Sequence, residues 1–375
     1  MRNKGRGILF VAALVALLAA AVVSTARAAA PAPVEVHGWM LNRFYAEPGN
    51  GHFEMERISL SAAKNLDTDI QTYIEWYYHH WANRKPELGS PWMLDSAYVN
   101  YTDKHGNQLR FGKGRNYCFG IVPAYANRRH SEYGLVSETI TQDRIVGLQY
   151  FGSTRDKKLD FGIALHNSLT PGTRFSGTDQ AMFRGDPFVP HLADKGEGKN
   201  LAVSARVAVP VVAGGKLGLS YRAGKLRGSE LTPDALLVKQ GLVPVGTTDD
   251  TNRRWGLDFN YKHACGLVAQ AEYYGAKAST LDFKTWDILV GFEPADPMGR
   301  KYYARYGKLN LDPPAVTSNP YTWDQKQLIL SVVQPLQKGK PLWLQLEFIR
   351  NDEDPSPLTA RVNNDVLFLE LFSGF

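Results

Sequence analysis

The stretch from Ser96 to Lys113 consists of two runs of alternating residues on either side of a polar turn. The first run reads Ser96-Ala97-Tyr98-Val99-Asn100-Tyr101, the turn reads Asp103-Lys104-His105-Gly106-Asn107, and the second run reads Gln108-Leu109-Arg110-Phe111-Gly112-Lys113. Alternation with a period of two indicates β-strands, and two such runs around a short turn containing glycine predict a β-hairpin. Beyond the second run the chain does not turn back at once, and residues 114–140 read as one long loop.

This order of a short turn followed by a longer connection recurs along the chain. Strand-like runs of period two continue to the C-terminus, and no long window has the 3.6-residue period of a helix. The connections expected after even-numbered strands are short, and they are residues 64–69, 102–107, 152–158, 213–215, 263–265, 293–300 and 334–341. Those expected after odd-numbered strands are mostly longer, and they are residues 79–95, 114–140, 167–200, 224–252, 312–324 and 350–364.

Loop lengths that alternate in this way are typical of bacterial outer-membrane barrels, in which short periplasmic turns alternate with long extracellular loops. We therefore predict an all-β fold, an antiparallel transmembrane β-barrel of about 16 strands. The long loop at about 114–140 is expected to fold into the barrel and to narrow it. Aromatic residues near the expected strand ends fit rings at the two membrane interfaces, and they are Trp39, Phe44, Tyr45, Trp76, Tyr78, Trp81, Trp92, Trp255, Tyr261, Tyr302, Tyr306, Trp323 and Trp343.

The N-terminus has the three parts of a secretory signal. Arg2, Lys4 and Arg6 form a basic start, residues 8–23 form an uncharged apolar run, and Ala26-Arg27-Ala28 is a small-x-small cleavage site. A membrane anchor is the alternative, but the apolar run is short of the roughly 20 residues that a spanning helix needs. We predict a signal peptide over residues 1–28 that is cleaved on export, followed by one barrel domain over residues 29–375.

The charge balance argues against a nucleic-acid partner. The full chain has 43 Lys+Arg and 37 Asp+Glu, and the signal peptide removes four basic residues and no acidic one, which leaves 39 against 37. The isoelectric point of about 9.1 therefore describes the precursor. A mean hydropathy of −0.30 fits a membrane barrel, because alternate residues face a wet lumen. The two cysteines, Cys118 and Cys265, are expected at opposite ends of the barrel, too far apart for a disulfide.

The end of the chain resembles the C-terminus of Gram-negative outer-membrane porins. Leu367, Leu369, Leu371 and Phe375 share one face of the last expected strand, and a terminal Phe resembles the assembly signal of that class. Ser373 departs from the pattern, because an apolar residue would continue the stripe there.

Three further stretches resemble the phosphate-selective porins of the O and P type. They are Phe53-Glu54-Met55-Glu56-Arg57-Ile58-Ser59-Leu60, Leu109-Arg110-Phe111-Gly112-Lys113 and Tyr303-Ala304-Arg305-Tyr306-Gly307-Lys308-Leu309. The resemblance implies a 16-stranded homotrimer that binds anions with arginines and lysines in its pore. The anion ligands of that family have no residue-by-residue counterpart in this chain, so phosphate selectivity is not carried over.

The expected function is passive diffusion of small hydrophilic solutes and ions through a water-filled channel in the outer membrane. The loop carries Arg115, Arg128, Arg129 and His130 and has no acidic residue before Glu132, so with Arg110 these residues are expected to face anions at the constriction. In a narrow pore such charges bias which ions enter. The alternative is a solvated loop that binds lipopolysaccharide phosphates or nothing. Residues of the lumen parity are Arg57, Glu75, Asp160, Arg206, Arg222, Asp258, Lys262, Glu272 and Glu347.

Catalytic and metal-binding patterns are weak. No Ser-His-Asp arrangement stands out, so no catalytic residue, and hence no enzyme, is predicted. His79 and His80 point to opposite faces of a strand, and the acidic pairs near residues 249 and 352 lack the spacing of a calcium loop. No metal or cofactor is expected, and the expected partners are outer-membrane lipid and lipopolysaccharide, small solutes or anions, and copies of this chain. Two alternatives remain: an outer-membrane barrel enzyme or adhesin with a plugged lumen, and a secreted soluble β-protein.

Overall fold

The computed structural model describes residues 33–47, 50–79, 92–121, 129–141, 144–167, 201–226, 228–239, 241–314, 324–353 and 365–375. The predicted signal peptide lies outside these ranges, as does Arg128. No helix in the described ranges is both long enough and apolar enough to cross a membrane.

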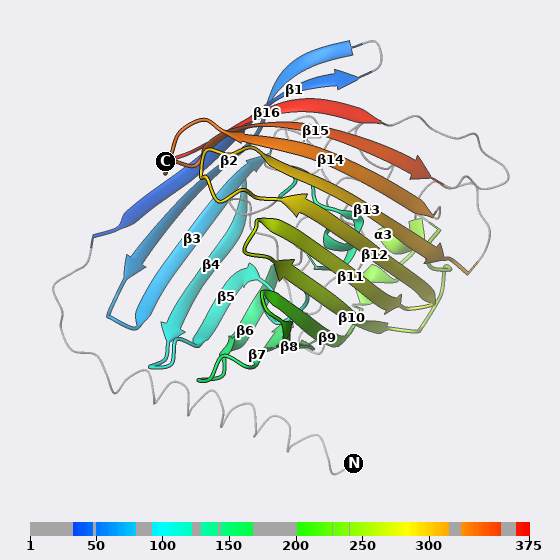
Figure 1. The fold of residues 1–375 in the computed structure, drawn as a ribbon. Helices are drawn as coiled ribbons and strands as arrows, with labels where there is room; N and C mark the ends of the chain where they lie inside the picture. The colour runs from blue at the N-terminus through cyan, green and yellow to red at the C-terminus, as the bar shows by residue number, and fades with distance from the viewer. Residues whose placement is uncertain are drawn as a thin grey trace.

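Sixteen antiparallel strands form a closed barrel, in which each strand pairs with its neighbours in sequence and β16 pairs with β1 (Figure 1). The strands are β1 (Glu35–Glu47), β2 (Asn50–Asn65), β3 (Ile70–His79), β4 (Trp92–Thr102), β5 (Gln108–Arg115), β6 (Arg144–Ser153), β7 (Asp160–Asn167), β8 (Leu201–Val212), β9 (Gly215–Lys225), β10 (Thr251–Lys262), β11 (Leu267–Ala278), β12 (Leu281–Phe292), β13 (Lys301–Asp312), β14 (Gln325–Pro335), β15 (Leu342–Glu353) and β16 (Val366–Gly374). The predicted fold class and strand count are confirmed.

Alternation along each strand separates an apolar outer face from a polar inner face. On β10, Trp255 and Leu257 are exposed while Arg254 and Asp258 are buried, as expected when one face meets lipid and the other lines the interior. Strand β13 keeps a single register along its length, so Leu309 lies on the same inner face as Arg305. The inner face of this strand changes from charged to apolar along its length.

The connections follow the predicted parity with two exceptions. Strands β1 and β2 are separated only by residues 48–49, and β11 and β12 only by residues 279–280. The longer connections include residues 116–143 between β5 and β6, called here the inner loop, and residues 226–250 between β9 and β10, called the outer loop. The inner loop contains the short helix η3 (Ser137–Thr141), and the outer loop contains η5 (Gly228–Glu230) and α3 (Leu236–Lys239).

Two β-bulges change the facing of charged residues. One bulge lies opposite Leu41 and Asn42, and it places both Glu56 and Arg57 inside the barrel. The other lies beside Glu75, and it places both Asp95 and Ser96 inside. A bulge opposes two residues to one, so strict alternation fails at both places.

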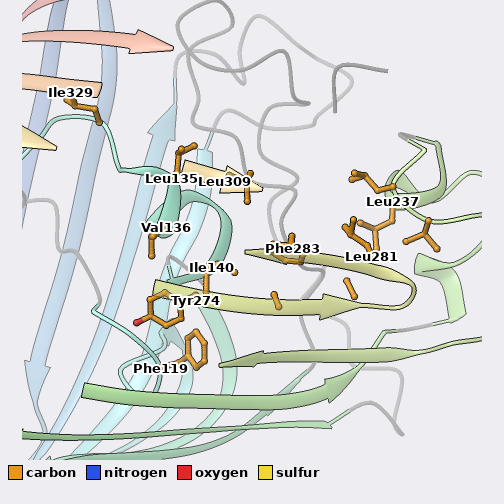
Figure 2. Packing of buried hydrophobic residues seen from close by; sticks show 14 of the residues in the cluster. Phe119, Leu135, Val136, Ile140, Leu237, Tyr274, Leu281, Phe283, Leu309 and Ile329 are labelled. Carbon is orange, nitrogen blue, oxygen red and sulfur yellow. The ribbon is translucent and has the colours of Figure 1, made fainter. Parts of the chain in front are cut away.

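The inner face of β11–β16 carries an apolar core toward its extracellular end. From the inner loop, Leu135, Val136 and Ile140 contribute to this core, and Figure 2 shows them near Leu309, Phe283 and Tyr274 of the wall. The outer loop adds Leu226, Leu237, Val238, Leu242 and Val243. We call this cluster the apolar plug, because it occupies the interior of the barrel and is built from two loops and the wall.

Three aromatic residues expected at a membrane interface, Trp39, Tyr45 and Trp343, lie inside the barrel instead, and Trp343 stacks on the buried Phe372 with ring centres 3.8 Å apart. Trp39 is 9% exposed and packs against Tyr77 and Phe372, and Tyr45 is 1% exposed and packs against Phe368. The prediction for these three residues is wrong, because position near a strand end does not say which face a ring occupies. The rings expected at residues 76, 255, 302 and 306 are exposed on the outer face, whereas Trp81 and Trp323 lie outside the described residues.

Candidate functional site

The first part of the inner loop lies along the wall formed by β6–β9. Asn116 Nδ2 donates to Ser204 Oγ at 3.1 Å, and the backbone NH of Tyr117 donates to Gln149 Oε1 at 3.0 Å. Further along, the backbone NH of Gly120 donates to Ser220 Oγ at 2.9 Å. Polar side chains of three strands thus accept hydrogen bonds from the first residues of the loop.

The second part of the loop reaches the opposite wall. The backbone NH groups of Ser131 and Glu132 both donate to the carboxylate of Glu347 on β15, each at 2.9 Å. The end of the loop returns to the side of its start, where Arg254 Nη1 on β10, the strand next to β9, donates to the carbonyl of Ile140 at 2.6 Å. Because the loop bonds to β6–β9 and also to β15 on the other side of the barrel, it crosses the lumen.

A buried arginine on β1 ties the loop to the place where the barrel closes. The side chain of Arg43 is fully buried, and its Nε donates to Glu370 on β16 at 2.8 Å. Its Nη1 donates to the Glu132 carboxylate and its Nη2 donates to Ser131 Oγ at 2.6 Å, both in the inner loop. Glu56 lies at 3.9 Å on the other side. One guanidinium therefore faces three carboxylates from β2, β16 and the inner loop.

Two loop glycines allow a close approach to the wall. Gly120 has φ +68°, and a Cβ there would meet Thr141 and the Tyr274 hydroxyl. At Gly134, a Cβ would lie 2.6 Å from Arg305 and from the Asp287 carboxylate. Only glycine combines the left-handed backbone of residue 120 with this lack of space.

Two of the predicted anion-facing residues are paired with carboxylates. Arg129 Nε donates to Glu293 Oε1 at 3.0 Å, and the other oxygen of Glu293 accepts from Lys262 Nζ at 2.7 Å. His130 is buried, with Nδ1 3.4 Å from the Glu347 carboxylate. These contacts offset much of the positive charge that the loop sequence indicates, and they bring Arg129 to the periplasmic turn after β12.

Glu293 should make this contact sensitive to acid. Burial alone would raise its pKa, but bonds and charges from Lys262 and Arg129 outweigh burial and lower the pKa. A lowered pKa stabilises the folded state above the ordinary glutamate range, and this contribution is lost as the pH falls through the folded pKa. We expect Glu293→Gln to lower the free energy of unfolding at neutral pH by about 1 kcal/mol, a modest value because Lys262 is exposed.

Urea unfolding in lipid vesicles at neutral pH and at a pH below the lowered pKa of Glu293 in the folded protein would measure this effect. The difference between the wild type and Glu293→Gln should shrink at the lower pH, because the wild-type carboxylate is then protonated. Asp282→Asn, at an exposed carboxyl on the other end of β12, is the matched control. A difference that does not change with pH would contradict the assignment.

The other predicted constriction residues lie on β5, with Arg115 at the end where the loop begins and Arg110 near the periplasmic turn. Arg115 Nη2 donates to the Tyr77 hydroxyl at 3.0 Å. Arg110 is 8% exposed on the inner face of β5, with its guanidinium carbon 3.9 Å from the ring centre of Tyr98. Arg128 lies outside the described residues.

Most residues expected to face the lumen lie on the inner wall in hydrogen-bonded or ion-paired sets. Arg206 pairs with Asp258, which lies in register with Glu272 on the next strand. Glu75 accepts from Ser59 Oγ at 2.7 Å and from the Tyr73 hydroxyl at 3.0 Å. Of the remaining residues in the predicted set, Arg57 pairs with Glu56, and Asp160 contacts Ser153 and Lys216. Arg222 is fully buried.

Several buried charges were missed by the sequence reasoning. The pair of Arg144 with Asp95, 2.6 Å apart, depends on the bulge near Glu75. Glu370 had a usable signal, since it alternates with Leu369 and Leu371 on the last strand. Arg43 had a similar signal on β1, where it lies on the same face as Trp39 and Leu41, at alternate positions of the strand.

The cysteines and the metal-binding residue types form no further site in the described part of the chain. Cys118 is buried in the inner loop, Cys265 is exposed in the turn after β10, and neither forms a disulfide. No group of three or more His, Cys, Asp or Glu side chains in the described ranges is arranged to hold a metal ion.

Comparison with known proteins gives a likeness in structure only. No family model matches the chain, and no curated protein matches it in sequence. DcaP, an outer membrane channel of Acinetobacter baumannii, superposes with a TM-score of 0.58 at 12% identity, over 93% of this chain and 99% of that chain. The anion-selective porin from Comamonas acidovorans gives 0.53 at 10% identity, over 92% and 100%.

The trimer form of OmpT, an outer membrane protein of Vibrio cholerae, gives a TM-score of 0.55 at 12% identity, over 92% of this chain and 100% of that chain. Identities this low carry information about the fold and not about the solute. The similarity extends over nearly the whole length of each protein, with no large part of either left unmatched. The chain therefore has the fold of outer-membrane channel barrels.

Proposed function

We propose that this protein is an outer-membrane porin, a water-filled channel through which small hydrophilic solutes and ions diffuse. The observation that carries the proposal is the inner loop, which crosses a closed barrel and bonds to walls on both sides. A loop seated in this way narrows the lumen without closing a catalytic pocket. Diffusion through such a pore requires a polar path, a constriction and placed charges rather than a catalyst.

The path for solutes runs along the inner wall of β3–β7. The apolar plug fills the extracellular end on the side of β11–β16, where ions would lose their hydration without compensation. The side of β3–β7 carries Glu75, Arg110 and Arg115, and Tyr117 of the inner loop is 38% exposed there. Polar and charged groups along this side would replace part of the hydration of a passing ion.

Arginines on this side support an anion preference. Arg129 and His130 contact carboxylates and add little net charge to the path. Arg110 contacts no carboxylate among the described residues, and with Arg115 it adds positive charge to a side that also carries Glu75. Low-dielectric walls focus the field of such charges.

The setting proposed for the channel is the bacterial outer membrane, after removal of residues 1–28 as a signal peptide. Exposed apolar side chains around the barrel, among them Val203, Leu219 and Ile288, suit contact with lipid. A homotrimer is the proposed assembly, in line with the trimer form of the Vibrio cholerae barrel.

Single-channel recording in a planar bilayer under a salt gradient tests the function. We expect conductance steps in groups of three and a reversal potential that favours anions. A cation-favouring reversal potential would overturn the anion preference alone. Folded, inserted protein without any conductance would overturn the channel, and the barrel enzyme or adhesin with a plugged lumen would replace it.

A further inference from the structure

Three aromatic rings lie around Arg110 on the inner wall near the periplasmic ends of β3–β6, and a fourth ring, Tyr73, stacks on one of them. Tyr73 and Tyr98 stack with ring centres 5.1 Å apart, and Tyr117 and Phe151 stack at 5.0 Å with an interplanar angle of 18°. The guanidinium carbon of Arg110 lies 3.9 Å from the centre of Tyr98, 5.0 Å from that of Tyr117 and 5.2 Å from that of Phe151. We call these five residues the arginine–aromatic cluster.

Arg110 differs from the arginines that pair with carboxylates, because it has no carboxylate partner in the described part of the chain. Its Nη2 donates to the neutral Gln108 Oε1 at 3.2 Å, and its buried Nε has no hydrogen-bond partner. By contrast, Arg43, Arg129 and Arg206 each contact a carboxylate. A buried guanidinium without a counter-charge is costly. An anionic group bound at Arg110 would supply that counter-charge and use the N–H donors that the chain leaves without partners.

Tyr117 offers an apolar surface next to these donors. It is 38% exposed, although its backbone NH is held by Gln149 and its ring is backed by Phe151. A ring that is backed by Phe151 and partly exposed can stack with a planar group of a solute. The cluster therefore combines a cationic fork with a stacking surface.

We propose that the arginine–aromatic cluster binds small carboxylates that carry an aromatic ring. The carboxylate accepts hydrogen bonds from Arg110, whose planar fork matches its geometry, while the ring of the solute stacks on Tyr117. Inorganic anions and acetate would use Arg110 and gain nothing from the rings. Neutral sugars would leave the guanidinium without a counter-charge. The proposal rests on the proposed channel and names the solute class that its path favours.

Block of the chloride current by benzoate, compared with acetate, tests the proposal in the full-length channel. The two anions carry the same charge, so the ring is the difference between them. We expect benzoate to reach half-block at a concentration about fivefold lower than acetate, as one stacking contact would give. Equal half-block concentrations would overturn the proposal.

Three variants separate the parts of the cluster. Tyr117→Leu should bring benzoate to the level of acetate and leave acetate unchanged, whereas Arg110→Gln should weaken both anions. Arg155→Gln removes a positive charge from the exposed periplasmic turn after β6, and this control should change neither. A loss in the Arg155 variant as large as that in the Arg110 variant would mean that general surface charge explains the effect.

Equilibrium dialysis of labelled benzoate against folded protein in detergent tests binding independently of current. We expect more benzoate bound by the wild type than by Arg110→Gln, with circular dichroism verifying that both are folded. Equal binding would overturn the proposal even if no current is carried. Normal chloride conductance without benzoate selectivity would overturn the proposal and leave the channel function intact.

Discussion

Replacing Arg43 by methionine is expected to lower the free energy of unfolding by about 3–5 kcal/mol, because removing one partner of a buried ionic cluster leaves the others uncompensated. Here the residues left behind are the carboxylates of Glu56, Glu132 and Glu370, all buried. Their mutual repulsion should detach Glu132, and with it the inner loop, from the wall. Channel conductance should rise as the loop moves.

Urea unfolding in lipid vesicles, followed by tryptophan fluorescence, measures the stability of the Arg43 variant. Arg350→Met is the matched control, because Arg350 is exposed on the outer face of β15 and its loss should cost little. Arg43→Lys keeps the positive charge but loses the planar guanidinium, so its loss of unfolding free energy should lie between those of the two methionine variants. A loss for Arg43→Met no larger than that for Arg350→Met would show that the cluster does not hold the loop.

Replacing Leu135 by aspartate is expected to unseat the apolar plug, with a loss of about 4 kcal/mol or more, the range of severe core substitutions. Leu135 is 2% exposed and packs in the cluster that includes Leu309, Ile329 and Phe283. A charge in this position has no partner in the cluster and would draw water into it. The barrel wall itself should persist, because its backbone hydrogen bonds do not depend on the loop.

Limited trypsin digestion of the inserted barrel measures whether the loop has left its seat. Cleavage after Arg129, which is held by Glu293 in the folded protein, should become much faster in Leu135→Asp than in the wild type. Leu135→Met conserves volume and should cost less than about 1.5 kcal/mol, so its digestion should match the wild type. Equal cleavage of all three proteins would show that the plug does not seat the loop.

The barrel was predictable because its two signals extend over the whole chain. Alternation gives the strands, and the parity of loop lengths gives the two ends, so an error in one strand does not alter the result. The inner loop was recognisable by its place after the hairpin that ends at Lys113. The local irregularities were not predictable in this way, since a bulge such as that at Glu56 shifts the pattern by one residue without a distinct composition.

The pairing of charges and the apolar plug were beyond the sequence for a different reason. Arg129 looks free in the sequence because its partner, Glu293, comes from a strand end far along the chain. On β14, Leu328, Ile329 and Leu330 are consecutive apolar residues, so alternation gives no inner face. In the structure, Gln327, Ile329 and Ser331 are buried and so mark the inner side.

The pairing of β1 with β16 closes the barrel, and it joins the two ends of the described chain. Arg43 and Glu370 are 327 positions apart, and contacts between such distant parts of a chain are slow to form because loop closure costs entropy before any contact compensates for it. The same guanidinium holds Glu132 of the inner loop. We therefore expect closure of the wall and seating of the inner loop to finish together in a late step, because a chain that has not yet added β16 lacks Glu370, one of the carboxylates that hold Arg43.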